Sequence, residues 1–165
     1  MKKPLLIIFS ILLVLLIAFF GFRKYTKSFS PETTVVYNKD GLDIGIIYHR
    51  PAKKGRHIFG REEDKALVPY GKVWRTGANE ATVIEIEKDV LFADQGSWKV
   101  ILNSETGQWG TNYNDGLNVI KTDIAIRVRP VIQELFTIYF EDQPKGVNMI
   151  LSWDQTEAII PILPQ

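Results

Sequence analysis

Hydrophobic residues run almost unbroken through the start of the chain, at residues 5–22 (LLIIFSILLVLLIAFFGF). The run contains no charged side chain, and its 18 residues would span about 27 Å as a helix, close to the thickness of the hydrocarbon layer of a bilayer. A soluble domain of this size has no core that could bury such a helix on all sides. The pattern therefore predicts a transmembrane helix at residues 5–22, within an N-terminal membrane anchor of residues 1–27.

A cleaved secretory signal is the alternative interpretation of the same run. Such a signal has an apolar stretch of about 7–15 residues followed by small residues. Here Ala18 is followed by Phe19 and Phe20, which is a poor cleavage site, and the chain has no cysteine for lipoprotein processing. We therefore expect an uncleaved signal anchor and a single-pass membrane protein.

The charges on the two sides of the run decide which side of the membrane the rest of the chain occupies. Lys2 and Lys3 precede the run, and Arg23, Lys24 and Lys27 follow it, so the positive-inside count is close to a tie. A very short basic N-terminus followed at once by an apolar run is typical of a signal anchor with its tail inside. We expect the rest of the chain on the extracytoplasmic (periplasmic) side, after a short tether at residues 28–32.

Beyond Pro31 the pattern changes to alternation with a period of two, rich in Ile, Val, Thr and aromatic residues, which is typical of β-strands. Asp40-Gly41 between the first two such segments predicts a tight hairpin. Pro161 and Pro164 indicate that the last strand lies at a sheet edge or ends there. The predicted strands are residues 33–37, 42–49, 81–87, 90–93, 98–102, 119–128, 135–141, 147–153 and 157–162. The pattern predicts an all-β domain at residues 33–165, an antiparallel β-sandwich of which a jelly roll is one form.

One long stretch, residues 50–82, does not follow this alternation. It is rich in glycine, proline and basic residues, yet it contains Phe59, Tyr70 and Trp74. A long ordered loop in a compact domain is commonly either functional or a packed cover over the core.

Composition and charge exclude several classes of function. The absence of cysteine excludes disulfides, thiolate metal sites and cysteine nucleophiles. The whole chain has a net charge of +1, but five of its 20 Lys and Arg residues lie in the anchor. The domain alone has 15 Lys and Arg against 19 Asp and Glu, a net charge of about −4. A domain of this sign argues against a nucleic-acid partner.

The most suggestive segment is residues 74–80 (WRTGANE), which groups an aromatic ring, a guanidinium, an amide and a carboxylate around a glycine. Such groups suit a polar ligand, because Trp stacks on a sugar and Arg binds a carboxylate in bidentate fashion. The structural alternative is a turn in which Arg75 ties loops together. We include Arg56 and Trp109, which stand in Gly-rich surroundings; the predicted ligand-binding residues are Arg56, Trp74, Arg75, Asn79, Glu80 and Trp109.

Catalytic and metal chemistry receive little support. His49 and His57 are the only histidines and do not form a metal-binding pattern, so no metal or other cofactor is predicted. None of the serines stands in a nucleophile-elbow motif. Glu85 and Glu87 share one face of a predicted strand that we expect to be solvated, and Trp109 could equally plug one end of a sandwich.

Residues 50–110 resemble a bacterial family known as domain of unknown function 2911. The resemblance rests on Arg50-Pro51, Gly55-Arg56, Ile58-Phe59-Gly60, the run 67–79, Ala81-Thr82, the run 98–103 and Gln108-Trp109-Gly110, and it extends over about residues 33–162. It implies a secreted or envelope-located β domain, and it supplies no reaction, cofactor or substrate. Similar members carry a further strand pair after the position of Ala93, where this chain runs straight into Asp94-Gln95; about 15 residues of hairpin are absent.

Together these observations predict a membrane-anchored, non-enzymatic domain that binds a polar ligand, a glycan or a peptide, in the cell envelope. The first alternative is a hydrolase with Glu80 as acid or base and a histidine assisting, which requires Glu80 to lie in a cleft with a shifted pKa. The second is a structural partner in an envelope complex, which requires an exposed apolar patch.

Overall fold

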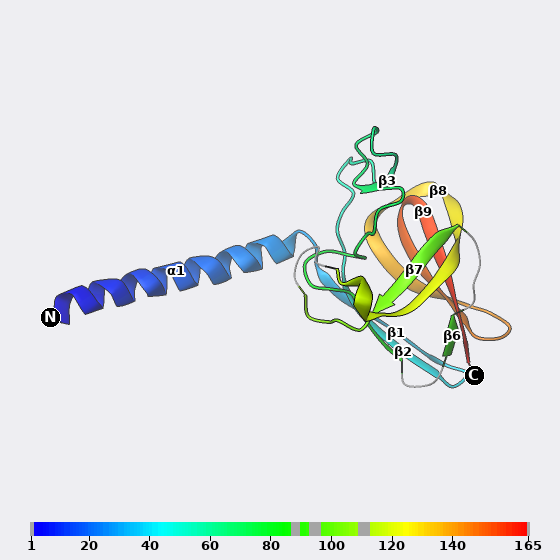
Figure 1. Ribbon diagram of the computed structural model, residues 1–165, viewed down its shortest axis with the longest axis horizontal. Coiled ribbons are helices and arrows are strands. Elements are labelled where there is room, and N and C mark those ends of the chain that lie inside the picture. Colours follow the sequence, from blue (N-terminus) through cyan, green and yellow to red (C-terminus); the bar gives the residue numbers. More distant parts are fainter. Residues whose placement is uncertain (1, 87–89, 93–96, 109–112, 165) are drawn as a thin grey trace.

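A computed structural model describes residues 2–86, 90–92, 97–108 and 113–164 of the chain. It begins with one long helix, α1 (Lys2–Ser28), which extends away from a β domain that holds the C-terminus at its far end (Figure 1). Within α1, residues Leu6–Ser28 are apolar and long enough to cross a membrane, with a mean hydropathy of 2.7 and none of the span buried. The helix has the length and composition of a membrane anchor or a signal sequence.

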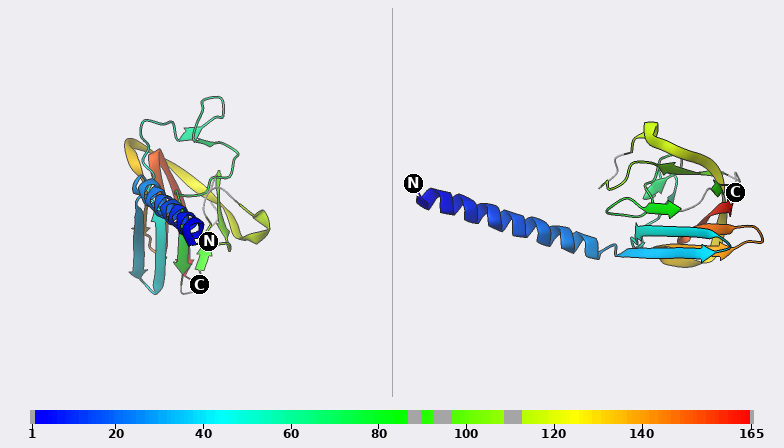
Figure 2. Two further views of the ribbon diagram at one scale, coloured as in Figure 1. Left: turned by 90° about the vertical axis from the view of Figure 1, so that its left-hand side faces the viewer. Right: turned by 90° about the horizontal axis from the view of Figure 1, so that it is seen from below.

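The strands of the β domain confirm the all-β expectation. They are β1 (Glu32–Lys39), β2 (Leu42–His49), β3 (Phe59–Gly60), β4 (Val68–Pro69), β5 (Val83–Ile86), β6 (Val90–Phe92), β7 (Trp98–Asn103), β8 (Asn118–Asp142) and β9 (Val147–Pro164), with a 3-10 turn η1 (Asp115–Leu117) before β8. Three sheets result, with the strand orders β1-β2-β5, β3-β4 and β6-β9-β8-β7. Figure 2 shows the β1–β2 ribbon and the long β8–β9 ribbon from two further sides.

The predicted hairpin between β1 and β2 is present. Lys39 pairs with Leu42, so that only Asp40 and Gly41 connect the strands, and both have positive φ angles of 52° and 78°. Two positive φ angles in a two-residue loop fit the right-handed twist of the flanking strands, and Asp-Gly is among the pairs that adopt them most readily.

The last four predicted strands are in fact two. Residues 119–128 and 135–141 belong to the single strand β8, and residues 147–153 and 157–162 belong to β9. Register shifts between Val128 and Gln133 and between Gln133 and Thr137 show that β8 bends through bulges instead of ending. A bulge inserts residues into one strand and increases its bend without breaking the pairing of the sheet.

The expectation of an edge position for the last strand was wrong, because β9 lies between β6 and β8. β9 pairs with β8 as far as Ile159 and with β6 from Ile162 onward. Pro161 falls between the two ladders, where its missing N–H leaves no registered pair unsatisfied. β9 does end at Pro164, as its sequence indicated.

One hydrophobic cluster joins the sheets. β2 contributes alternate residues Leu42, Ile44, Ile46 and Tyr48, which are at most 1% exposed and pack against buried residues of β8 and β9. Those partners include Ile124, Phe136, Ile138, Val147, Met149, Trp153, Ala158, Ile160 and Ile162. From the irregular stretch 50–82, Phe59 and Trp74 pack on this cluster, so this part of the stretch covers the core.

Candidate functional site

The predicted segment 74–80 forms a turn that closes against the end of β2. Gly77 has a φ of 89°, and a Cβ atom at that position would lie 3.1 Å from both the His49 carbonyl oxygen and Thr82 Oγ1. Asn79 also has a positive φ, 57°, and Thr82 Oγ1 donates to the Thr76 carbonyl at 2.8 Å. Glycine is required at position 77 by both its conformation and the close approach, and the turn brings Asn79 and Glu80 beside the end of β2.

Trp74 takes part in an aromatic cluster of the core. Its ring stacks on Trp153 at a centroid distance of 5.8 Å and an interplanar angle of 25°, and it meets Phe59 and Phe136 edge to face, each at 5.5 Å. Trp153 and Phe136 are 2% and 1% exposed. One face of the Trp74 ring is therefore covered by protein, which is the arrangement of a packing residue.

Arg75 and Asn79 make hydrogen bonds to backbone carbonyls of separate loops. Arg75 Nη2 donates to the Asn79 carbonyl at 2.6 Å and Nη1 to the Gln108 carbonyl at 3.2 Å, while Asn79 Nδ2 donates to the Ser30 carbonyl at 3.3 Å. Burial lowers the pKa of the Arg75 guanidinium, and the charge of Glu80 acts in the opposite direction. Both side chains tie loops together, as the structural alternative predicted.

Glu80 connects the β domain to α1. Its Oε1 lies 2.5 Å from Lys27 Nζ and 3.3 Å from Arg23 Nη2, both in the last turns of the helix. Burial of the Glu80 carboxyl acts to raise its pKa, but the hydrogen bonds from Lys27, its own backbone N–H and Arg23 outweigh burial, and the pKa is lowered. We call Arg23, Lys27, His49, Asn79 and Glu80 the helix-end cluster.

The imidazole of His49 completes this cluster from the domain side. Nε2 lies 3.3 Å from Glu80 Oε2 and 3.7 Å from Glu32 Oε2, and the side chain is 3% exposed. The contact with Glu80 has the distance of an ion pair but is not a hydrogen bond, and Glu80 Oε2 has no hydrogen-bond partner in the described structure. The other ring nitrogen, His49 Nδ1, is buried and also has no partner there. Across the described residues, no three His, Asp or Glu side chains are grouped to hold a metal ion.

The remaining two predicted site residues lie elsewhere. Arg56 is exposed and donates to the carbonyls of Lys53 and Ala52 at 3.0 and 2.5 Å, so its contacts fix its own loop and include none of the other candidates. Trp109 and the break after Ala93 lie outside the described residues. Gln108 accepts from both Arg75 and the Ala81 N–H, so the chain at Gln108 lies against the loop that contains Trp74.

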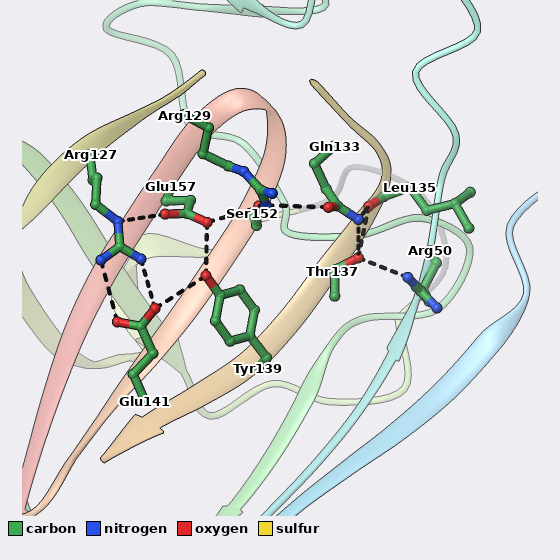
Figure 3. Close-up of polar contacts among 10 residues, drawn as sticks. All are labelled: Arg50, Arg127, Arg129, Gln133, Leu135, Thr137, Tyr139, Glu141, Ser152 and Glu157. Atoms are coloured by element: carbon green, nitrogen blue, oxygen red, sulfur yellow. Dashed lines mark hydrogen bonds and ion pairs between the residues drawn. The ribbon is translucent and has the colours of Figure 1, made fainter. Parts of the chain in front are cut away.

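A second polar group lies on β8 and β9, and it was not predicted (Figure 3). Its centre is Glu157, which is 4% exposed and is bound by Arg127 Nε at 2.6 Å, the Tyr139 hydroxyl at 2.8 Å and Arg129 Nη1 at 3.2 Å. Arg127 also binds Glu141 with both terminal nitrogens, at 2.8 and 3.4 Å. These contacts join the two arms of the bent strand β8, because Arg127 precedes the bulges and Tyr139 and Glu141 follow them.

The network continues through buried hydroxyls. Arg129 Nη1 donates to Ser152 Oγ at 2.7 Å and to Gln133 Oε1 at 3.2 Å, and Ser152 is fully buried. Gln133 Nε2 in turn donates to Thr137 Oγ1, which also accepts from Arg50 Nη2 at 2.8 Å. We call this connected set, from Glu141 to Arg50, the strand network (Figure 3).

The strand network favours the ordinary charge states of Tyr139, Glu157 and Arg127. Burial raises the pKa of Tyr139 to about 12, with help from its hydrogen bond to Glu157. Burial of Glu157 acts to raise its pKa, but hydrogen bonds from Tyr139 and Arg127 outweigh it and lower the value. Hydrogen bonds to Glu141 and Glu157 raise the pKa of Arg127. The arrangement holds charges in place and is poorly suited to transferring protons near neutral pH.

The sequence contains a signal for this network. Arg127, Arg129, Glu141 and Glu157 stand beside apolar residues in their strands, and a charge at such a position either faces solvent or finds a partner. Which charges pair depends on the bend of β8, and that bend was not predicted.

The family model described as protein of unknown function (DUF2911) matches the chain in two segments, residues 30–96 and 91–162. The segments meet at the position where the chain was expected to be shorter than its relatives. Searches of curated proteins and of solved structures gave no match. Because the matched segments cover nearly the whole β domain, the chain belongs to the family of proteins of unknown function DUF2911.

Proposed function

We propose that the chain is a single-pass membrane protein whose β domain acts without catalysis, binding a polar ligand close to the membrane surface. The observation that carries the anchored part of the proposal is the salt bridge between Glu80 and Lys27 at 2.5 Å, with Arg23 at 3.3 Å from the same oxygen. It fixes the domain directly on the end of the apolar helix. Loss of α1 would leave Glu80, whose side chain is 25% exposed, without either of these cations.

Further contacts at the end of α1 support a permanent anchor. Tyr25 and Phe29 meet edge to face at 4.9 Å, and Lys54 Nζ lies 4.6 Å from the centre of the Phe29 ring. Aromatic and basic side chains are typical of the membrane–water interface at the end of a spanning helix. We place the β domain on the extracytoplasmic side because the short basic N-terminus precedes the apolar run at once. Fusions of a periplasm-dependent phosphatase and of a cytoplasm-dependent fluorescent protein at Gln165 test this; only the phosphatase should be active.

The shared core supports the finer fold that we propose, a β-sandwich. β2 lies in one sheet and β8 and β9 in another, yet their inward residues form a single cluster. Two sheets with alternating inward residues in one core are the defining feature of a sandwich.

A hydrolase with Glu80 as acid or base receives less support from the same geometry. His49 does lie beside Glu80, at 3.3 Å. The pKa of Glu80 is lowered, however, and an effective general acid or base has a pKa near the working pH. Two cations already bind the carboxylate that would have to accept a proton.

The second candidate, a structural partner in an envelope complex, is favoured by one observation. Leu67, Tyr70 and Val73 are 46%, 59% and 59% exposed on one short segment, and exposed apolar groups mark contact surfaces. Chemical cross-linking of envelope proteins to a photoreactive residue at position 70 should give one defined product if this candidate holds, and no product if it does not.

Thermal unfolding of the full chain in detergent micelles tests ligand binding. The protein is heated alone and with envelope glycans or short peptides. A ligand present at about 100 times its dissociation constant adds about 2.7 kcal/mol to the free energy of unfolding, which gives a readily measured rise in melting temperature. A rise with one class of compound supports the binding proposal. Unchanged melting with every class favours the structural partner.

A further inference from the structure

The bend of β8 carries four residues that β9 does not pair. Val128 is in register with Thr156 and Gln133 with Asp154, so five steps along β8 correspond to two along β9. Residues 129–132 therefore project as a bulge. Bulges of this kind redirect side chains and are common beside functional sites. We call residues 128–132 the β8 bulge.

The β8 bulge exposes apolar side chains. Val128, Val131 and Ile132 are 78%, 66% and 54% exposed, and Val128 is the most exposed large hydrophobic residue of the described structure. Apolar side chains gathered on the surface of a domain mark a site of contact with another molecule.

Arg129 lies between Val128 and Val131 in the sequence of the bulge, and one terminal nitrogen of its guanidinium is held by other residues. Its Nη1 contacts Ser152 Oγ at 2.7 Å, Gln133 Oε1 at 3.2 Å and Glu157 Oε1 at 3.2 Å. Ser152 and Glu157 are 0% and 4% exposed, so the acceptors are fixed in the interior. Neither Nε nor Nη2 of Arg129 has a hydrogen-bond partner in the described part of the chain, and 26% of the side chain is exposed.

The charges around Arg129 nearly balance. In the strand network Arg50, Arg127 and Arg129 stand against Glu141 and Glu157, which leaves one positive charge. Two acids adjoin the bulge: Asp154 lies 3.1 Å from Lys53 Nζ, and Glu134 keeps its negative charge while its Oε1 accepts from the Lys54 N–H at 2.8 Å. An anion would therefore be bound by the guanidinium edge of Arg129 and not by a general excess of positive charge.

We propose that the β8 bulge binds a peptide segment that carries a carboxylate next to an apolar side chain. The Nε–Nη2 edge of Arg129 accepts the carboxylate in the planar, two-bond geometry that guanidinium groups favour. Val128, Val131 and Ile132 contact the neighbouring apolar side chains of the peptide. The assignment rests on the proposed binding function and names its site and ligand class.

The experiment measures fluorescence polarisation of labelled peptides with the full chain in detergent micelles, against empty micelles. The probe is Gly-Ser-Leu-Asp-Leu amide, and its matched control contains Asn in place of Asp. Arg129→Gln removes the charge, Arg129→Lys keeps the charge without the planar edge, and Val128→Ser alters the surface without touching the strand network. Arg61→Gln and Val119→Ser are the controls, because Arg61 is 74% exposed in another loop and Val119 is 67% exposed on β8 away from the bulge.

We expect the Asp peptide to bind at least tenfold more tightly than the Asn peptide. Arg129→Gln should weaken binding about tenfold or more, consistent with loss of a charge-assisted pair of hydrogen bonds. Arg129→Lys and Val128→Ser should weaken it severalfold, and both controls should stay within about twofold.

Several outcomes overturn the proposal. These are no binding of the Asp peptide, equal binding of the Asp and Asn peptides, and an equal effect of Arg61→Gln and Arg129→Gln. Competition by galacturonate oligomers at lower concentration than the peptide would reassign the site to acidic glycans. If Arg129→Gln lowers the melting temperature strongly, its binding result is set aside. The effect of Val128→Ser on binding of the Asp peptide then decides, and an unchanged affinity overturns the proposal. A negative result here together with a positive ligand screen leaves the proposed function standing and rejects only the bulge.

Discussion

Glu80 Oε1 lies 2.5 Å from Lys27 Nζ, which joins the loop before β5 to the last turn of α1. Asn79, the residue before Glu80, binds the Ser30 carbonyl, so two consecutive residues of the loop hold the chain that leaves the helix. Residues 28–32 were expected to be a short tether. Ser28 ends α1, residues 29–31 each make a backbone hydrogen bond, and Glu32 begins β1. The predicted segment 74–80 therefore joins the β domain to α1 through Asn79 and Glu80.

The joint predicts energetic coupling between Glu80 and Lys27. Glu80→Gln and Lys27→Met should each lower the free energy of unfolding of the full chain in micelles by about 1 kcal/mol, because both side chains are partly solvated. The double variant should show a coupling energy of about 0.5 kcal/mol or more. The control cycle uses Glu63 and Arg61, 3.7 Å apart and 71% and 74% exposed, for which coupling near zero is expected. Equal coupling in the two cycles would contradict the joint.

Substitution of Trp74 tests whether this side chain packs in the core or binds a ligand. Trp74→Ala should destabilise the domain by about 3 kcal/mol and remove near-ultraviolet circular dichroism from the stacked Trp74–Trp153 pair. Tyr70→Ala in the same stretch, where the ring is 59% exposed, should change stability by less than about 0.5 kcal/mol. A fully stable Trp74→Ala protein would return this residue to the list of ligand contacts.

Acid should weaken the domain through Glu157. Its pKa is lower in the folded chain than the ordinary value of 4.5, so the unfolded chain binds the proton more tightly. The stabilisation is complete above about pH 4.5 and is lost as the pH falls through the folded pKa. Glu157→Gln should cost about 2 kcal/mol at pH 7 and flatten the fall in stability below pH 4.5. Urea unfolding at pH 7, 5, 4 and 3 measures this, with the exposed Glu105→Gln as the control.

Tyr139 predicts a loss of stability at alkaline pH. Its pKa rises to about 12 from the ordinary value of 10, so its contribution is complete below pH 10 and is lost as the pH rises toward 12. Burial also raises the pKa of Tyr37, so the assay uses the Tyr37→Phe protein: absorbance at its phenolate band should show a tyrosine that ionises late, and adding Tyr139→Phe should remove it. The same substitution should cost about 1 kcal/mol at pH 7, since Glu157 loses a hydrogen-bond donor. Late ionisation of the same size in the single Tyr37→Phe and the double Tyr37→Phe, Tyr139→Phe proteins would refute the assignment.

The strand pattern was predictable where alternation and turn chemistry agreed. Residues 42–49 were expected as a strand and form β2 with the same bounds, and Asp40-Gly41 forms the expected turn. The bend of β8 was not predictable from the same signals, because Pro130 reads as the end of a strand. It is tolerated in a bulge, where β9 offers no partner for its missing N–H.

For the candidate site, the grouping of four residues was predictable and their contacts were not. Trp74, Arg75, Asn79 and Glu80 do gather in one turn, as their spacing indicated. Their partners are Trp153, Gln108, Ser30 and Lys27, which are distant in sequence, so no local pattern could decide between a ligand and the protein itself. The strand network depended in the same way on contacts across the bend of β8.

Because α1 is continuous from Lys2 to Ser28, any change in its length also rotates the β domain about the helix axis. Each helical residue turns the chain by about 100° and advances it by about 1.5 Å. Arg23 and Lys27 are four residues apart and lie on one face of the helix, and both contact Glu80. These two contacts fix the rotation of the helix relative to the β domain. One residue inserted in the middle of the span would turn the domain by more than a quarter circle relative to the far end of the helix. An insertion of seven residues would return the domain nearly to its original orientation about the helix axis.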